Sequence, residues 1–247
     1  YNDAADARFD RLVARSRHRP VARGAVSPNR AYLFALFQLT LVLYPFTQLC
    51  FPPECLPHMV IMVLLFGLYA LTKRVSDFPQ VVLGVAFAWA VLFCGAAMDI
   101  EIFTHEGKGK EMGNGNGKAT LALFTANVLW TIIYDTVYAH QDIADDAAVG
   151  VKSMSLRFRR STKLLSSILG ALQVLLLALC GFWAGFGALY FLGTVCGVGL
   201  ALAYFIYDVE LNSPASCGKW FRDQFGIVGG MFVLGLLGEY VMKLKGL

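Results

Sequence analysis

The sequence YDTVYAHQDIADD at residues 134–146 places four carboxylates at and beyond the end of an apolar run that covers residues 118–138. A run of about 20 apolar residues is long enough to cross a bilayer as one helix. Carboxylates are costly inside lipid, so several of them at the end of such a run are typical of a functional site at the membrane edge. This stretch therefore predicts a membrane-spanning helix with an acidic, functional end.

The chain contains seven apolar runs of this kind, and together they predict an all-α integral membrane protein. Hydrophobic residues make up 57% of the 247 residues and charged residues only 15%, which is far more apolar than a soluble domain of this length. The predicted spans cover residues 31–53, 57–72, 79–98, 118–138, 164–183, 188–207 and 225–241. The run at 57–72 is the weakest, because a helix of its length reaches only about 24 Å.

Most of the basic residues lie in loops on the same side of the membrane as this acidic segment. That side holds 16 of the 21 Lys and Arg side chains if the N-terminal segment faces the cytoplasm or its equivalent. Such a bias with an odd number of spans is the positive-inside pattern of a multi-pass protein in the lipid bilayer. The basic residues form no stripe, so the net charge of +4 does not indicate binding of nucleic acid.

A second acidic cluster reads NDAADARFD, beginning at Asn2, and lies on the same side. On a helix Asn2, Asp6 and Asp10 form one polar ridge, because residues four apart share a face. Asp142 and Asp146 are likewise four apart. Carboxylates packed so closely repel one another unless a cation lies between them, and Mg²⁺ prefers hard oxygen ligands together with substrate phosphates. The two clusters therefore predict Mg²⁺-assisted handling of a diphosphate.

The six cysteines show neither a CxxC pair nor a metal-binding spacing with histidine. Most of them fall within or beside the predicted spans, where a free cysteine behaves as a small apolar residue. They are predicted to serve packing, and a disulfide between Cys50 and Cys55 is the alternative.

The two acidic clusters resemble the paired signatures of the UbiA superfamily of intramembrane prenyltransferases. The first signature corresponds to NDxxDxxxD from Asn2, followed by RHRPVARGAVS from Arg17, and the second to YDTVYAHQDIADD running into VGVKS. Between them, YALTKR from Tyr69 and PQVVLG from Pro79 are similar to that family's central loop. The resemblance covers essentially the whole chain. It is greatest to the 4-hydroxybenzoate polyprenyltransferase branch and to fungal enzymes that farnesylate aromatic polyketide acids on the way to meroterpenoids.

The resemblance implies a bundle of nine transmembrane helices in which the two motifs face each other across a central cavity. One Mg²⁺ is placed on the first motif and another on the second, and the implied metal ligands are Asn2, Asp3, Asp6, Asp10, Asp142, Asp145 and Asp146. The implied diphosphate ligands are Arg19, Lys73, Arg74 and Lys152. Asp6 and Asp142 are implied to be catalytic through the metals. Asp135 is implied to remove the ring proton, to orient the acceptor, or to contact the metals through water.

The chain departs from the family pattern at its start. Seven spans are predicted where the family has nine, and the first signature begins at residue 2 and not at the end of a second span. The expectation is a single UbiA-like domain over residues 1–247 that lacks its first two transmembrane helices.

The implied reaction is transfer of a prenyl group, with farnesyl favoured, from an isoprenyl diphosphate to a ring carbon of a phenolic aromatic acid. Meroterpenoid biosynthesis in an endomembrane is the favoured setting. The alternative within the family is the 4-hydroxybenzoate polyprenyltransferase of ubiquinone biosynthesis, in the mitochondrial inner membrane.

Three other interpretations compete with this one. The acidic residues could merely end helices and face water, which suits one such cluster better than two on the same side. A cation transporter would also collect carboxylates, but transporters generally place ion sites near the bilayer midplane, and nearly all acids here lie at membrane edges. An inactive membrane scaffold is favoured only by the predicted loss of two helices.

Overall fold

The structure, a computed structural model, describes residues 1–45, 51–98 and 113–245. Within those ranges all regular secondary structure is helical, which confirms the predicted all-α class. The elements in chain order are α1 (Asn2–Ala5), α2 (Ala7–Asp10), α3 (Pro28–Pro45), α4 (Cys55–Thr72), α5 (Pro79–Ala97), α6 (Gly113–Ala139), the 3-10 helix η2 (His140–Asp142), α7 (Ile143–Val149), α8 (Met154–Arg157), α9 (Thr162–Ala184), α10 (Ala188–Tyr190), the π-helix η3 (Phe191–Cys196), α11 (Gly197–Asp208) and α12 (Pro214–Leu244).

Every one of the seven predicted spans contains helix. In the described part of the chain, six helical segments are long and apolar enough to cross a membrane: α4, α5, α6 with α7, α9, α10 with α11, and α12. The weakest predicted span lies within α4 and is among them. The predicted span at 31–53 coincides in part with α3, and its residues 46–50 lie outside the described ranges. The chain is thus a multi-pass integral membrane protein.

Local sequence signals set the ends of several helices. α5 carries Pro79 in its first turn, where a backbone N–H would have no hydrogen-bond partner within the helix. The side-chain oxygen of Ser213 caps α12 by accepting a hydrogen bond from the N–H of Ser216 (3.3 Å). α7 ends at Gly150, whose φ of +76° is the left-handed conformation that glycine adopts without strain. That turn directs the next residues back toward the loop after α4.

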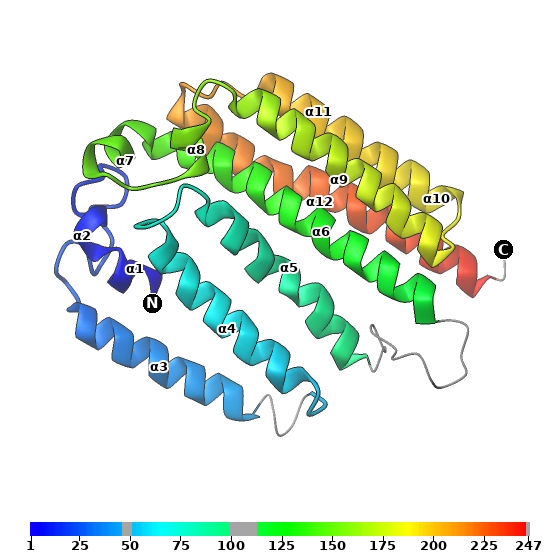
Figure 1. Cartoon of the computed structure of the whole chain (residues 1–247), viewed down its shortest axis with the longest axis horizontal. Coiled ribbons are helices and arrows are strands. Elements are labelled where there is room, and N and C mark those ends of the chain that lie inside the picture. Colours follow the sequence, from blue (N-terminus) through cyan, green and yellow to red (C-terminus); the bar gives the residue numbers. More distant parts are fainter. Residues whose placement is uncertain (46–50, 99–112, 246–247) are drawn as a thin grey trace.

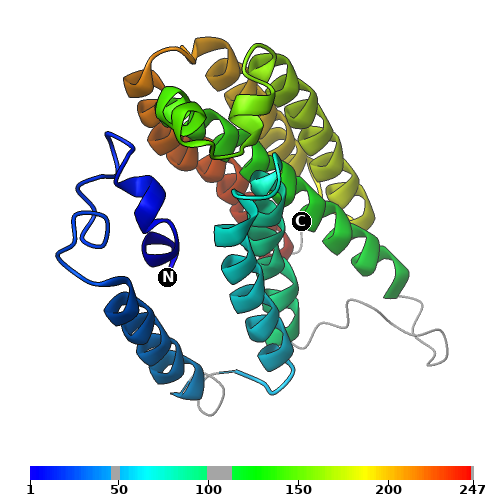
Figure 2. The ribbon, with the colours of Figure 1, turned by 60° about the vertical axis from the view of Figure 1, so that its left-hand side comes forward.

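Helix α6 lies at the centre of the bundle. It packs against α5 on one side and α9 on the other, and it also contacts α12. Figure 1 shows the long helices side by side, with α1, α2, α7 and α8 gathered at one end. Figure 2 shows α1, α2 and α3 on one side of the molecule, where α1 contacts both α3 and α4. The two acidic motifs are therefore brought to the same end of the bundle.

The packed core lies among α6, α9, α11 and α12. Ile133, Leu177, Leu202 and Val228, one from each of these helices, are at most 2% exposed. In contrast, α3 has no buried residue, and its large apolar side chains such as Phe34 remain exposed. An apolar exterior of this extent is what contact with lipid requires.

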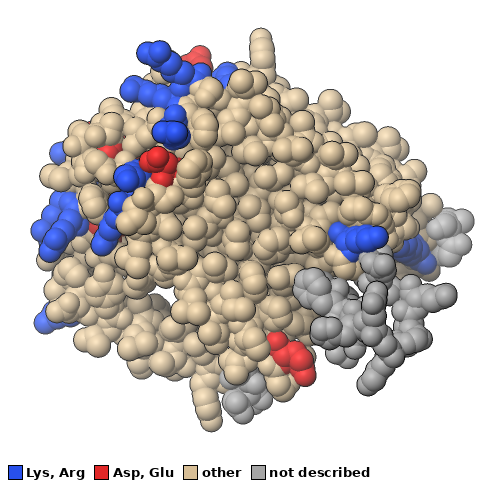
Figure 3. Space-filling model, viewed as in Figure 1, with Lys and Arg blue, Asp and Glu red and all other residues tan. Residues whose placement is uncertain are grey.

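Charged side chains gather at the end that carries the motifs. In the view of Figure 3, most of the visible Lys and Arg lie over α1, α2, α7 and α8, and the middle of this face carries almost no charge. A smaller basic group lies toward the opposite end. This distribution agrees with the predicted grouping of basic residues on the side of the acidic motifs.

The cysteines of the described residues are all free, which agrees with a packing role. Three of them, Cys55, Cys180 and Cys217, are buried, and Cys94 and Cys196 are exposed. Cys50, the alternative partner of Cys55, lies outside the described residues.

Candidate active site

The first acidic motif forms two short helices with a bend at Asp6. α1 ends and α2 begins at this residue, whose φ of −88° and ψ of 2° depart from helical values. The single continuous helix expected from the spacing is therefore wrong, since aspartate is a weak helix former and the chain turns there. The N–H of Asp6 still bonds to the carbonyl of Asn2 (2.8 Å), and the N–H of Asp10 bonds to the carbonyl of Asp6 (2.9 Å). The three residues keep the predicted shared face and line one cavity.

The second acidic motif lies where α6 gives way to η2 and α7. Asp135 is on the last turns of α6, Asp142 is the last residue of η2, and Asp146 is in the first turn of α7. All three line the same cavity as the first motif. Asp145 does not line it, because its carboxylate accepts a hydrogen bond from the backbone N–H of Ala14 (2.8 Å).

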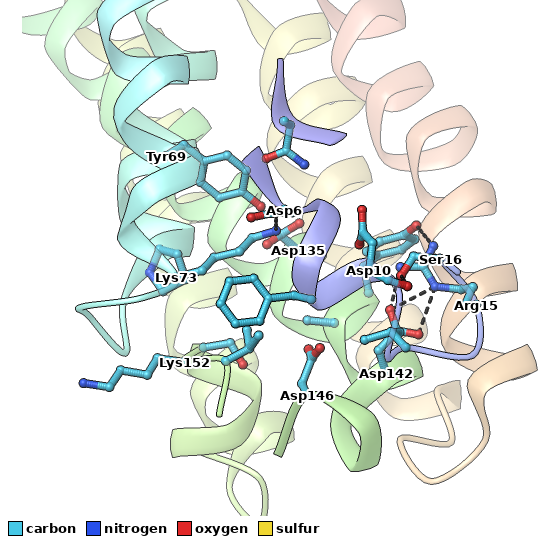
Figure 4. A pocket seen from close by; sticks show the side chains of 18 of the residues that line it. Asp6, Asp10, Arg15, Ser16, Tyr69, Lys73, Asp135, Asp142, Asp146 and Lys152 are labelled. Carbon is cyan, nitrogen blue, oxygen red and sulfur yellow. Dashed lines mark hydrogen bonds and ion pairs between the residues drawn. The ribbon is translucent and has the colours of Figure 1, made fainter. Parts of the chain in front are cut away.

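The cavity between the two motifs has a volume of about 200 Å³. Figure 4 shows Asp6 and Asp10 on the side of the first motif and Asp142 and Asp146 on the side of the second, with Lys73 reaching toward Asp6. Lining residues outside the predicted ligands are Phe9, Val13, Arg15, Ser16, Tyr69, Pro79, Gln80, Tyr138, Ala139, Val151 and Ser153. The space is thus acidic on two walls, with basic and aromatic side chains between them.

Lys73 follows the last turn of α4 and brings a positive charge next to the first motif. Its Nζ lies 3.4 Å from a carboxylate oxygen of Asp6 and 5.1 Å from the ring centre of Tyr69. The carbonyl of Lys73 accepts a hydrogen bond from the N–H of Lys152 (2.9 Å), so the loops after α4 and α7 are joined. Gln80 reinforces this link, because its Oε1 accepts a hydrogen bond from the first N–H of α8 (3.1 Å).

Arg19 is held beside the first motif by two carboxylates. Its Nη1 donates hydrogen bonds to Oδ1 of Asp3 (3.1 Å) and to Oδ2 of Asp10 (3.0 Å). Arg19 and Asp10 line the cavity, whereas Asp3 does not and its side chain is 47% exposed. Asp3 is therefore placed to orient Arg19 and not to bind a metal ion inside the cavity.

Arg15 is a residue of the site that the motifs did not predict. Its Nε and Nη2 donate to both carboxylate oxygens of Asp142, and its Nη1 donates to the hydroxyl of Tyr138 (2.9 Å). The hydrogen bonds to Asp142 raise the pKa of Arg15 above its ordinary value, against the opposing effect of burial, so the guanidinium is charged. Its only signal in the sequence is membership of a group of seven arginines in residues 1–30, which does not single out one of them.

Two predicted diphosphate ligands do not face the acidic residues. Arg74 does not line the cavity: its Nη2 donates to a backbone carbonyl at the end of α1 (2.7 Å), and its guanidinium lies over the ring of Phe9 (5.7 Å). Lys152 does line the cavity, but its Nζ bonds to the carbonyl of Val75 (3.4 Å). Figure 4 shows its side chain directed away from the carboxylates.

The oxygen atoms of the cavity fit a hard divalent cation that is shared with a diphosphate. Among the described residues, no three His, Cys, Asp or Glu side chains already form a group that could hold a metal ion. However, Oδ1 of Asn2 is buried without a hydrogen-bond partner, and the Asp146 carboxylate has neither a hydrogen bond nor an ion pair within the described ranges. Mg²⁺ usually takes one or two protein carboxylates and completes its shell with water and substrate phosphate. This donor set suits that mode of binding.

The helical bundle and the paired acidic motifs define the class of protein. The chain belongs to the UbiA prenyltransferase family, whose pattern matches residues 1–235. Prenyltransferases of this family generally use a divalent metal such as Mg²⁺.

Two similar proteins carry the names of 4-hydroxybenzoate prenyltransferases. The chain is 35% identical over 236 residues to the mitochondrial 4-hydroxybenzoate polyprenyltransferase of Rattus norvegicus, which covers 96% of this chain and 59% of that protein. It is 35% identical over 232 residues to 4-hydroxybenzoate geranyltransferase 2 of Lithospermum erythrorhizon, which covers 92% of this chain and 70% of that protein. The chain therefore spans about three fifths of the length of the rat relative.

A solved structure shows the same fold. The apo structure of a UbiA homolog from Aeropyrum pernix K1 matches with a TM-score of 0.75 and 21% identity, over 97% of this chain and 83% of that one. The predicted family and fold are thus confirmed.

Proposed function

We propose that this protein transfers a prenyl group from an isoprenyl diphosphate to a ring carbon of a phenolic aromatic acid, in a Mg²⁺-dependent reaction. One observation carries the proposal: two acidic motifs far apart in the chain line a single cavity together with Lys73 and Arg19, at the charged end of an apolar bundle. Such a site can hold an anionic headgroup while the hydrocarbon tail remains among apolar helices. The names of the two relatives support the same class of reaction.

Both motifs supply oxygen ligands for Mg²⁺. Asn2 and Asp6 face the cavity from the first motif, and Asp142 and Asp146 face it from the second. When bound, Mg²⁺ neutralises charge on the diphosphate and makes it a better leaving group. Within the described ranges, Oδ1 of Asn2 and the carboxylate of Asp146 have no partner, so they are the atoms most ready to accept it.

The basic residues of the cavity bind the diphosphate and stabilise the charge that develops as it leaves. Lys73 acts as a point charge, whereas Arg19 offers a planar pair of donors that matches two phosphate oxygens. Stabilisation of developing charge in a site shielded from water is usually the largest contribution to catalysis. Lys73 and Arg19 are therefore assigned to the donor.

The acceptor half of the reaction requires a base. As the bond from the allylic carbon to the diphosphate oxygen breaks, a ring carbon of the phenol forms the new carbon–carbon bond, and the ring proton must then leave. We assign removal of this proton to the carboxylate of Asp135, which lines the cavity close to Lys73 (Figure 4). The ring face of Tyr69, also in the cavity, is placed to stabilise the allylic cation.

Donor and acceptor identity separate two forms of the proposal. We favour farnesyl diphosphate and an aromatic polyketide acid, in meroterpenoid biosynthesis in an endomembrane. The alternative is a longer donor and 4-hydroxybenzoate, in ubiquinone biosynthesis at the mitochondrial inner membrane. The name of the rat relative, a mitochondrial 4-hydroxybenzoate polyprenyltransferase, supports the polyprenyl donor, the 4-hydroxybenzoate acceptor and the mitochondrial location of this alternative. Both forms use the same headgroup site.

Product analysis tests the proposal directly. Membranes that contain the protein are incubated with Mg²⁺, a panel of phenolic acids and donors from geranyl to long polyprenyl diphosphates, and products are identified by mass spectrometry. A prenylated acid that forms with Mg²⁺ and disappears with EDTA is the expected result, and its tail and acceptor decide between the two forms. Cation flux without any prenylated product would support a transporter, and neither flux nor product would support an inactive scaffold.

Replacing Lys73 with alanine should lower kcat/KM for the donor about 10- to 100-fold, because a charge-assisted contact to the diphosphate is lost. The matched variant Lys152→Ala should lower it only about threefold, because that Nζ is directed to the carbonyl of Val75. Initial rates at varied donor concentration measure both. Equal losses in the two variants would show that Lys73 has no special place in donor binding.

A further inference from the structure

We propose that Arg15 is a diphosphate ligand that occupies Asp142 until the substrate arrives. In the structure its guanidinium occupies both carboxylate oxygens of Asp142, and it would leave them when Mg²⁺ and the diphosphate bind. Arg15 then turns from the carboxylate to the phosphate. This inference rests on the proposed function, because it assigns a further residue to the same headgroup site.

The contact between Arg15 and Asp142 engages both oxygens of that carboxylate. Three hydrogen bonds join the two side chains: Nε lies 3.0 Å from Oδ1 and 2.9 Å from Oδ2, and Nη2 also donates to Oδ2. The Asp142 side chain is 12% exposed, so little of it remains open to water. A cation that binds Asp142 therefore competes with the guanidinium for the same oxygens.

The other cavity ligands differ from Asp142 in this respect. Among the described residues, Oδ1 of Asn2 has no hydrogen-bond partner, Asp146 is unpaired, and Asp6 makes one long contact of 3.4 Å to Lys73. A first metal ion can therefore bind without breaking a strong pair. Asp142 alone of these four residues is engaged through both oxygens, so binding of a metal ion to Asp142 is coupled to the movement of Arg15.

The backbone around Arg15 is fixed, so a change in its side-chain rotamer is sufficient. The preceding residue, Ala14, donates its N–H to Asp145 (2.8 Å), and the following residue, Ser16, donates its hydroxyl to the carbonyl of Asp10 (3.3 Å). These bonds hold the loop against both motifs at once. Arg15 already lines the cavity, and Figure 4 shows it at the edge where Asp10 and Asp142 approach each other. Its planar fork matches phosphate oxygens as well as it matches a carboxylate.

Binding of Mn²⁺, a paramagnetic substitute for Mg²⁺, tests the exchange without reference to activity. The purified full chain in detergent is titrated with Mn²⁺, and free Mn²⁺ is followed by electron paramagnetic resonance with and without inorganic pyrophosphate. Arg15→Ala is compared with Arg17→Ala, a matched control in the same loop whose guanidinium contacts His18 and, in the described part of the chain, no carboxylate. Arg15→Lys keeps a cation at the position, and thermal melting shows that each variant is folded.

For Arg15→Ala, the affinity for Mn²⁺ and the affinity for pyrophosphate should change in opposite directions. Without pyrophosphate it should bind Mn²⁺ about tenfold more tightly than the wild type, because the competing cation is gone. With Mn²⁺ present, its affinity for pyrophosphate should fall about tenfold, because a phosphate ligand is lost. Arg15→Lys should lie between Arg15→Ala and the wild type, and Arg17→Ala should match the wild type.

Unchanged Mn²⁺ affinity in Arg15→Ala would overturn the displacement, and unchanged pyrophosphate affinity would overturn the transfer to phosphate. Either result would leave the proposed function standing as long as the wild type binds Mn²⁺ with pyrophosphate. Failure of the wild type to bind them together would instead contradict the proposed headgroup site, and with it this role of Arg15.

Discussion

Replacing Asp6 with asparagine is expected to reduce prenyl transfer by a factor of about 100 to 1,000. The substitution keeps the size of the side chain but removes a negative charge from a residue that is only 6% exposed. A buried carboxylate that binds a catalytic metal contributes several kcal/mol through charge, and an amide oxygen replaces it poorly. Single-turnover rates at saturating Mg²⁺ and donor, with product quantified by mass spectrometry, measure the effect.

A matched control separates the metal-ligand role of Asp6 from a general loss of charge. Asp208→Asn makes the same chemical change on an exposed residue at the end of α11, outside the cavity, and should change the rate less than about twofold. Thermal melting should show that both variants are folded. Near wild-type turnover in Asp6→Asn would mean that the first motif does not bind the catalytic metal.

The spacing of the acidic residues predicted that each motif presents its oxygens on one face, and the family resemblance implied that the two motifs face each other across a cavity. Residues four apart share a helical face. The first motif precedes an apolar segment and the second motif ends one, and both lie on the side that carries most basic residues. The structure accordingly brings Asn2, Asp6 and Asp10 to the same cavity as Asp142 and Asp146. The bend at Asp6 divides the helix in two, but the acidic side chains stay on one face. The reason is that the backbone hydrogen bonds between residues four apart persist on either side of the bend.

The choice among basic residues could not be predicted in the same way. Lys73 and Arg74 are neighbours in the turn after α4, where no helical period applies, and only Lys73 turns into the cavity. Likewise, the loop after α2 carries several arginines, and only tertiary contacts with Tyr138 and Asp142 select Arg15. Loop side chains are positioned by partners far away in the sequence, so local patterns do not determine where they point.

Close contacts between helices are a second feature that hydropathy does not predict. Gly193 in η3 faces Gly235 in α12, and a Cβ added at Gly193 would lie 2.7 Å from the Cα of Gly235. At the same crossing, the hydroxyl of Thr194 donates to the carbonyl of Phe232 (3.0 Å). Small residues let helices in membranes approach closely enough for such backbone contacts.

Replacing Gly235 with valine is therefore expected to destabilise the bundle by about 3 kcal/mol or more. The added Cβ would overlap the backbone nitrogen and the hydroxyl of Thr194, which are rigid parts of η3 and cannot move aside as a flexible side chain would. For a protein of this size that loss corresponds to a fall in melting temperature of about 6–12 °C. Thermal unfolding in detergent, followed by size-exclusion chromatography of the remaining folded protein, measures it.

Gly226→Val in the same helix is the matched control, because a Cβ there meets no atom within 4 Å. Valine has a somewhat higher helix propensity than glycine, so this variant should melt at or slightly above the wild-type temperature. Gly235→Ala adds the Cβ alone and should fall between the two valine variants if the contact with Thr194 is the cause. Equal melting temperatures for Gly235→Val and Gly226→Val would show that α12 and η3 do not meet as closely as the structure has them, and that the crossing does not hold this side of the bundle together.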